Sequence, residues 1–156
     1  MQSIQYQEID HALEEKIAQK FGAYVSEGNY IHRGDGCLSL AAVCNGEPVG
    51  FISTFKLRLP PPLNAYEEAY IDVLEVDAAF RRQGISSEMI HRTEQWAKAY
   101  GYRQIRAWSS EDKVEAIPMW YALDYCVCPT LLAHSTHGTV PGVYVSKMLN
   151  PQNVME

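Results

Sequence analysis

A strand, a tight turn and a long amphipathic helix follow one another between residues 69 and 101. This unit constrains the fold of the 156-residue chain more than any other segment. Residues 69–76, AYIDVLEV, have the apolar content of a strand. In residues 85–100 the apolar side chains recur on one face of a helix, and Gly101 is the type of residue that ends helices. A strand that leads into a long helix favours a sheet with helices packed on it.

The alternation of aliphatic and acidic residues within 69–76 changes phase once. Up to Val73 the aliphatic side chains occupy odd-numbered positions, and from Leu74 onward they occupy even-numbered ones. A slip of one residue in a period of two is typical of a β-bulge, and it places Glu75 at the bulge. A strand buried on both faces would also blur the alternation, so both interpretations stay open at this point.

The remaining segments form a mixture of strands and helices without strict alternation. Asn45-Gly46 is a strong turn signal and predicts an antiparallel hairpin over 37–59, which the prolines at 60–62 end. Asp10 can cap a helix that runs to about Val25. This order predicts an α/β (mixed α+β) fold with a sheet that is antiparallel in part. The other elements expected are strands at 3–9, 103–108, 126–133 and 142–149, a helix at 114–123, and loops at 26–36 and 134–141.

Composition and charge limit the class of protein. A chain of 156 residues with 47% hydrophobic and 21% charged residues is expected to form a single domain spanning 1–156. Its formal net charge of -6 argues against nucleic acid as a partner and suits a small basic substrate. The sequence has no apolar run of membrane-spanning length and no export signal. We therefore expect no membrane partner, a cytoplasmic location and cysteines without disulfides.

The turn between the strand and the helix suggests a ligand. It reads Arg81-Arg82-Gln83-Gly84-Ile85-Ser86. The glycine lets the backbone turn tightly, and the first N–H groups of the helix have no intrahelical partner and lie at the positive end of its dipole. Two arginines beside these groups would suit a pyrophosphate. The alternative is a solvated basic turn before a helix, but the preceding strand, the expected bulge and the following helix together favour a phosphate cradle.

This segment resembles the signature of the GNAT superfamily of acetyl-CoA-dependent N-acetyltransferases. The family carries Gln/Arg-x-x-Gly-x-Gly/Ala between its fourth strand and the following helix, and residues 81–86 match this pattern with Ser86 as a small-residue departure. Residues 74–77, Leu-Glu-Val-Asp, are similar to the end of the family's fourth strand. The order of elements is also similar along nearly the whole chain. The resemblance implies a central mixed, mostly antiparallel sheet flanked by helices and splayed at strands 4 and 5.

The resemblance also implies how acetyl-CoA would be held. Main-chain groups of Leu74 and Val76 would pair with the amides of its pantetheine arm, in the gap between the splayed strands. Main-chain N–H groups from Arg82 to Ser86 would hold the pyrophosphate, and the side chains of Arg81 and Arg82 would add positive charge. No metal is expected. The cofactor-binding residues implied are Leu74, Val76, Arg81, Arg82, Gln83, Gly84, Ile85 and Ser86.

The reaction implied is the direct attack of an amine on the thioester carbonyl in a ternary complex, since the motif contains no nucleophilic cysteine. Such an attack needs a base for the ammonium proton and a backbone N–H as oxyanion donor. Five acidic residues and no Lys or Arg lie between Leu59 and Phe80, and such an acidic edge would attract an amine. Glu75 is the first candidate for the base. Asp72 is the second, and it is also the candidate for substrate binding. The acceptor expected is a primary amine of a small molecule or a peptide.

The general acid is expected in the last helix. The family pattern there is Ala-x-x-x-Tyr-x-x-x-Gly-Phe. A match from Ala116 puts Trp120 at the tyrosine position, and Tyr121 lies one residue, or about 100° of helix, further on. Either Pro118 shifts the phase of the helix so that Tyr121 serves as the acid, or the thiolate leaves without a tyrosine acid. Tyr121 is therefore the candidate acid, and Trp120 is expected to pack against the cofactor or the core.

Two other classes of protein stay open on the sequence. A CoA-binding regulatory or interaction module with little catalysis would carry the same 81–86 signature, and the irregular last helix is compatible with it. Cys126 and Cys128, with His134 and His137, have the ligand types of a zinc-stabilised domain. Ordinary strand thiols beside a polar loop fit this spacing better. A homodimer is compatible with this kind of fold.

Overall fold

The computed structural model describes residues 3–110, 115–134, 136 and 138–149. A seven-stranded sheet with the order β1-β2-β3-β4-β5-β7-β6 forms its centre. Neighbouring strands are antiparallel except β4 and β5, which are parallel, so the sheet is mixed and mostly antiparallel as predicted. The strands are β1 (Ile4–Glu8), β2 (Leu38–Cys44), β3 (Glu47–Arg58), β4 (Glu67–Val76), β5 (Gln104–Ser110), β6 (Cys126–His134) and β7 (Gly138–Met148).

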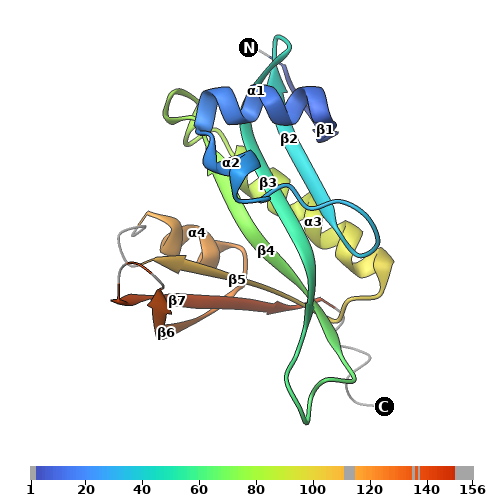
Figure 1. Ribbon diagram of the computed structural model, residues 1–156, viewed down its shortest axis with the longest axis vertical. Helices are drawn as coiled ribbons and strands as arrows, with labels where there is room; N and C mark the ends of the chain where they lie inside the picture. The colour runs from blue at the N-terminus through green and yellow to red at the C-terminus, as the bar shows by residue number, and fades with distance from the viewer. Residues whose placement is uncertain (1–2, 111–114, 135, 137, 150–156) are drawn as a thin grey trace.

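Helices cover both faces of the sheet (Figure 1). α1 (His11–Phe21) and the short α2 (Tyr24–Glu27) lie on one face, here called the α1 face. α3 (Ile85–Tyr100) lies on the opposite face, here called the α3 face. A turn of 3-10 helix (Ala78–Phe80) follows β4, and α4 (Ala116–Ala122) packs against β6.

Each face of the sheet has its own hydrophobic core. On the α1 face, Leu13 and Ile17 of α1 belong to one buried cluster with Phe51 of β3. On the α3 face, Met89 and Ile90 of α3 belong to a larger cluster that extends from β2 to β7. The apolar face predicted for 85–100 therefore packs against the sheet. This packing holds the N-terminus of α3 beside the end of β4.

Truncation of a buried side chain of α3 should lower the stability of the protein. Ile90 is fully buried, so we expect Ile90→Ala to lower the free energy of unfolding by about 2–5 kcal/mol, because it removes buried methyl groups and leaves a cavity. Urea denaturation of both proteins measures the difference. Leu63→Ala is the matched control, since that side chain is 53% exposed and its truncation should change stability by no more than about 0.5 kcal/mol. Equal stabilities for the two variants would contradict the packing of α3.

Two element boundaries differ from those predicted. The helix capped by Asp10 ends at Phe21 instead of continuing to about Val25, because Gly22 has a φ of 134° and turns the chain into the separate α2. The loop expected at 134–141 is shorter, since β7 already begins at Gly138. Pro141 lies within β7, where it pairs with Leu131 of β6.

The cysteines are free thiols in the structure. None of the four cysteines, all of which lie in described segments, forms a disulfide. His137 and the side chain of His134, which the zinc alternative would need, lie outside the described residues. The described residues hold no group of three or more side chains arranged to bind a metal. None of the helices in the described segments is long and apolar enough to cross a bilayer.

Candidate active site

The register slip predicted in β4 is a β-bulge at Asp72. Consecutive residues of β3 pair with Val73 and Ile71, so Asp72 is the extra residue. Beyond it, Leu74 packs on the same α3-face core that Ile71 contacts, which accounts for the change of parity in the sequence. The bulge is thus confirmed, but its expected position at Glu75 is wrong. Glu75 is a regularly paired residue three positions later.

The sheet opens directly beyond this bulge, as the resemblance implied. β4 and β5 pair at three successive positions, and the pair of Ile71 with Ala107 is the one next to the bulge. A cavity of about 260 Å³ fills the space between the separated strands, with Met119 and Trp120 of α4 on its wall. Among the residues that the structure describes, the backbone of 72–76 has no ladder partner on the β5 side. Its main-chain N–H and C=O groups on that edge are therefore available to a ligand.

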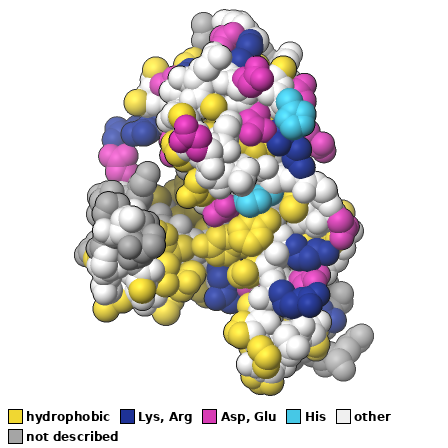
Figure 2. Space-filling view, viewed as in Figure 1, with side chains coloured by type: hydrophobic (Ala, Val, Ile, Leu, Met, Phe, Trp, Pro, Cys, Tyr) yellow, Lys and Arg dark blue, Asp and Glu magenta, His cyan; other side chains and the backbone are white. Residues whose placement is uncertain are grey.

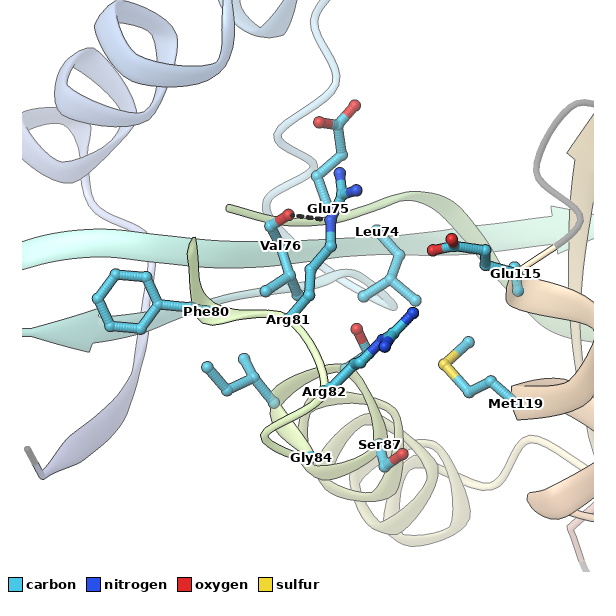
Figure 3. Close-up of a pocket in the computed structure, with 13 residues that line it drawn as sticks. Leu74, Glu75, Val76, Phe80, Arg81, Arg82, Gly84, Ser87, Glu115 and Met119 are labelled. Atoms are coloured by element: carbon cyan, nitrogen blue, oxygen red, sulfur yellow. Dashed lines mark hydrogen bonds between the residues drawn. The ribbon is translucent and has the colours of Figure 1, made fainter. Parts of the chain in front are cut away.

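A larger cavity of about 880 Å³ adjoins the first one at the N-terminus of α3 (Figure 3). The two share Leu74, Glu75, Ala116 and Met119 in their walls. Most of the expected cofactor residues line the larger cavity, but Gln83 is exposed and is not part of its lining. The expected residues that do line it are Leu74, Val76, Arg81, Arg82, Gly84, Ile85 and Ser86.

The N-terminus of α3 has the backbone geometry of an anion site. Gly84 is the N-cap residue with a φ of 78°, and no side chain caps the helix. Arg82 has a φ of 61°, so two of the three residues before the helix take the left-handed conformation. The Arg81 guanidinium donates from Nε to the carbonyl oxygen of Val76 at 3.2 Å, which fixes that side chain against β4. The first N–H groups of α3 are left for a ligand, with positive charge beside them.

Two candidate carboxylates approach the opening from the α1 face. The Tyr24 hydroxyl donates to Glu75 Oε1 at 2.7 Å, and His32 Nε2 lies 2.7 Å from Asp72 Oδ2. In Figure 3 the carboxylate of Glu75 points away from the larger cavity. Burial raises the pKa of Tyr24 and the hydrogen bond to Glu75 raises it further, so the phenol keeps its proton and donates. Within the described segments, neither carboxylate forms an ion pair with a lysine or arginine.

His32 is held beside Asp72 by its backbone. Its N–H donates to Ser53 Oγ at 3.0 Å, and its carbonyl oxygen accepts from Ser39 Oγ at 2.8 Å. The two serine hydroxyls are buried and lie 2.7 Å from each other. The imidazole also contacts the ring of Phe55, with 4.8 Å between the ring centres. These contacts fix the position of a loop residue against β2 and β3.

Tyr121 does not reach either cavity. α4 is continuous from Ala116, and Pro118 lies in its first turn, where a missing N–H breaks no helical hydrogen bond. The helix phase is therefore not shifted. Trp120 is buried at 4% exposure and packs edge-on against Tyr125, as expected for a packing residue, whereas Tyr121 is 60% exposed.

Three side chains of the site were not predicted from the sequence. His32 and Tyr24 lie in segments assigned to a loop and to the end of a helix, and neither has a local pattern that points to Asp72 or Glu75. Glu115 precedes α4 and points into the larger cavity in Figure 3. The acidic edge of β4 was the one available signal for the first two, because a polar partner for it could have been sought.

A mixed sheet that opens between two parallel strands, beside a helix N-terminus with free N–H groups, defines a protein with a binding site suited to a phosphate-bearing ligand. The model of the acetyltransferase (GNAT) family matches residues 5–125. The chain belongs to this family of N-acetyltransferases.

Solved structures share the fold over nearly their whole length. Arabidopsis thaliana NAA60, in complex with a bisubstrate analogue, is 15% identical with a TM-score of 0.78, covering 94% of this chain and 99% of its own. An aminoglycoside 6'-N-acetyltransferase complexed with coenzyme A is 17% identical with a TM-score of 0.69, covering 95% and 98%. A GCN5-related N-acetyltransferase from Kribbella flavida is 21% identical with a TM-score of 0.69, covering 93% and 97%. Curated protein sequences give no significant match.

Proposed function

We propose that the protein transfers the acetyl group of acetyl-CoA to the primary amine of a small molecule or peptide, by direct attack in a ternary complex. The opening between β4 and β5 carries this proposal. The cavity at the α3 N-terminus adjoins it on one face, and Asp72 and Glu75 line it with their partners on the other. Two substrates that approach from opposite faces can meet there. The bisubstrate complex of the Arabidopsis protein supports such a meeting in this fold.

The residues of the larger cavity fit acetyl-CoA, which when bound supplies an activated thioester acetyl group. The open edge of β4 gives Leu74 and Val76 main-chain groups that can pair with pantetheine amides. The N–H groups from Arg82 to Ser86 and the charges of Arg81 and Arg82 suit a pyrophosphate. Gly84 lines this cavity with a φ of 78°, a conformation that favours glycine, and the space at its Cβ position is open.

On the α1 face, we assign proton removal to Glu75 and binding of the ammonium group to Asp72. Tyr24 orients one oxygen of Glu75, which leaves the other to accept the proton of the attacking amine. Asp72 lies at the bulge beside the separated strands, and within the described segments no lysine or arginine pairs with its carboxylate, which suits it to attract an ammonium. A main-chain N–H of the bulge is the candidate oxyanion donor.

The leaving thiolate needs no tyrosine acid in this proposal. Glu75 takes one proton from the ammonium, and the neutral amine then adds to the thioester carbonyl to form the C–N bond and an oxyanion. The oxyanion collapses as the C–S bond breaks, the amide nitrogen loses its second proton to solvent, and the thiolate takes a proton from solvent. This route follows from the placement of Tyr121, which is 60% exposed and outside both cavity walls. It is the second of the two alternatives left open by the sequence. Tyr121→Phe should accordingly leave the rate of CoA release unchanged.

The proposal is tested by two measurements on the intact chain. Calorimetry should detect acetyl-CoA binding, and a screen of primary amines should detect amine-dependent release of CoA. Binding without turnover on any amine would instead favour the CoA-binding regulatory or interaction module. No binding of acetyl-CoA would overturn the site assignment itself.

A further inference from the structure

The α1 face carries a row of aromatic side chains directly beside the opening. His32 contacts Phe55, and Phe55 contacts Tyr70 with 5.2 Å between the ring centres. Tyr70 and its neighbour Arg106 on β5 form one of the three residue pairs that precede the opening. The Arg106 guanidinium stacks on Tyr144 at 5.8 Å from the ring centre. We call His32, Phe55, Tyr70 and Tyr144 the aromatic ledge.

The side chains of the ledge are accessible. All four side chains are only partly buried. Figure 2 shows hydrophobic side chains gathered in the hollow of this face, with acidic side chains along its upper edge. Burial raises the pKa of Tyr70 to about 12, with smaller effects in the same direction from Tyr144 and Asp72, so its hydroxyl stays neutral. The surface beside the opening is therefore apolar and aromatic, in contrast to the acidic side chains at the opening itself.

The charges at the ledge favour a single cation at one end. Arg106 is held by Glu68, which is buried and accepts from Nε at 2.9 Å and from Nη2 at 3.3 Å, so this positive charge is neutralised. Asp72 follows Tyr70 by two residues and has His32 as its partner, and Glu75 has Tyr24. Within the described segments neither carboxylate has a lysine or arginine partner, so both can attract a cation at the opening, while the rest of the ledge offers ring faces.

We propose that the acceptor is a primary amine attached through a short chain to an aromatic ring, with the ammonium at Asp72 and the ring on Phe55 and Tyr70. This inference rests on the proposed function, because it takes the opening as the point of transfer. A flexible polyamine would leave the ledge uncovered, and a polyhydroxylated amine would place hydroxyl groups against ring faces. An aromatic ring packs on such faces in offset or edge-on contact.

A measurement of amine binding without turnover tests the aromatic acceptor independently of catalysis. We would titrate 2-phenylethylamine and n-butylamine into the CoA-loaded protein by calorimetry, since bound CoA carries no acetyl group to transfer. The aryl amine should bind roughly 10-fold more tightly than the alkyl amine. Phe55→Leu and Tyr70→Leu should each remove most of this preference, because they keep apolar volume but lose the ring. Tyr66→Leu is the matched control, since Tyr66 is 53% exposed and its ring lies under Arg103, outside the ledge.

The possible results distinguish a wrong aromatic acceptor from a wrong proposed function. Equal binding of the two amines to the wild type, or a preference that survives both ledge variants, would overturn the aromatic acceptor. If a variant is less stable, its binding of n-butylamine shows whether the site is intact, because that amine needs Asp72 and not the rings. If the protein binds the aryl amine more tightly but acetylates no amine, the ledge is still a binding surface for aromatic rings and the proposed acetyl transfer is rejected. Turnover of amines without an aryl preference would retain the function and reject the ledge.

Discussion

Replacement of Gly84 by glutamate should abolish acetyl-CoA binding, with a loss in affinity of at least about 100-fold. Gly84 lines the larger cavity at the N-terminus of α3, and a Cβ there meets no atom within 4 Å. The new side chain would therefore enter the cradle without a clash. Its carboxylate would occupy the space of the pyrophosphate and would repel the phosphate charges. Calorimetric titration of both proteins with acetyl-CoA measures the effect.

Gly46→Glu is the matched control for this experiment. Gly46 has a φ of 80° against 78° for Gly84, and it too has open space at its Cβ position. Both substitutions therefore impose the same left-handed strain and the same charge, but Gly46 lies in the β2–β3 turn, outside the cavity. Thermal melts should show both variants folded. If Gly84→Glu binds acetyl-CoA as the Gly46 control does, the phosphate cradle is assigned to the wrong place.

Replacement of Glu75 by glutamine should lower kcat by about 10²- to 10⁴-fold, because the amide cannot take the proton of the attacking amine. Acetyl-CoA binding should stay unchanged, since the carboxylate points away from the larger cavity in Figure 3. Steady-state release of CoA at saturating donor and amine gives kcat, and calorimetry gives the affinity for acetyl-CoA. Loss of both together would indicate a disturbed β4 instead of a missing base.

Two further variants make the assignment of Glu75 specific. Asp72→Asn should act mainly on the KM for the amine, because this carboxylate is assigned to ammonium binding. Tyr24→Phe removes the hydroxyl that donates to Glu75 and should lower kcat by less than Glu75→Gln does, since the base itself remains. A large fall in kcat for Asp72→Asn with an unaffected Glu75→Gln would show that Asp72 is the base and that the two roles are exchanged.

Local patterns account for the parts of the site that lie within one stretch of chain. The spacing of apolar residues in α3, the glycine before it and the phase slip in β4 are all properties of neighbouring residues. They predicted the helix, the phosphate cradle and the existence of a bulge. They did not locate the bulge at Asp72, because its position is set by pairing with β3, whose register cannot be read from β4 alone.

Contacts between distant segments determine the rest of the site. His32 meets Asp72 across 40 residues of chain, and Tyr24 meets Glu75 across 51. Phe55 joins the ledge because β3 pairs with β4 at Tyr70. Side chains from a loop, a short helix and two strands come together only when helices and sheet pack. The periodicity of a single segment cannot predict contacts between distant segments.

In α4, the sequence and the tertiary structure determine different properties of the same two side chains. Its sequence established that Trp120 and Tyr121 lie about 100° apart on a helix, so that one alone could face the opening. The tertiary structure decided which one, by burying Trp120 against Tyr125 and leaving Tyr121 at the surface. The physical reason is that amino-acid order sets the angles within an element, whereas the orientation of the element depends on the apolar surface that its neighbours offer.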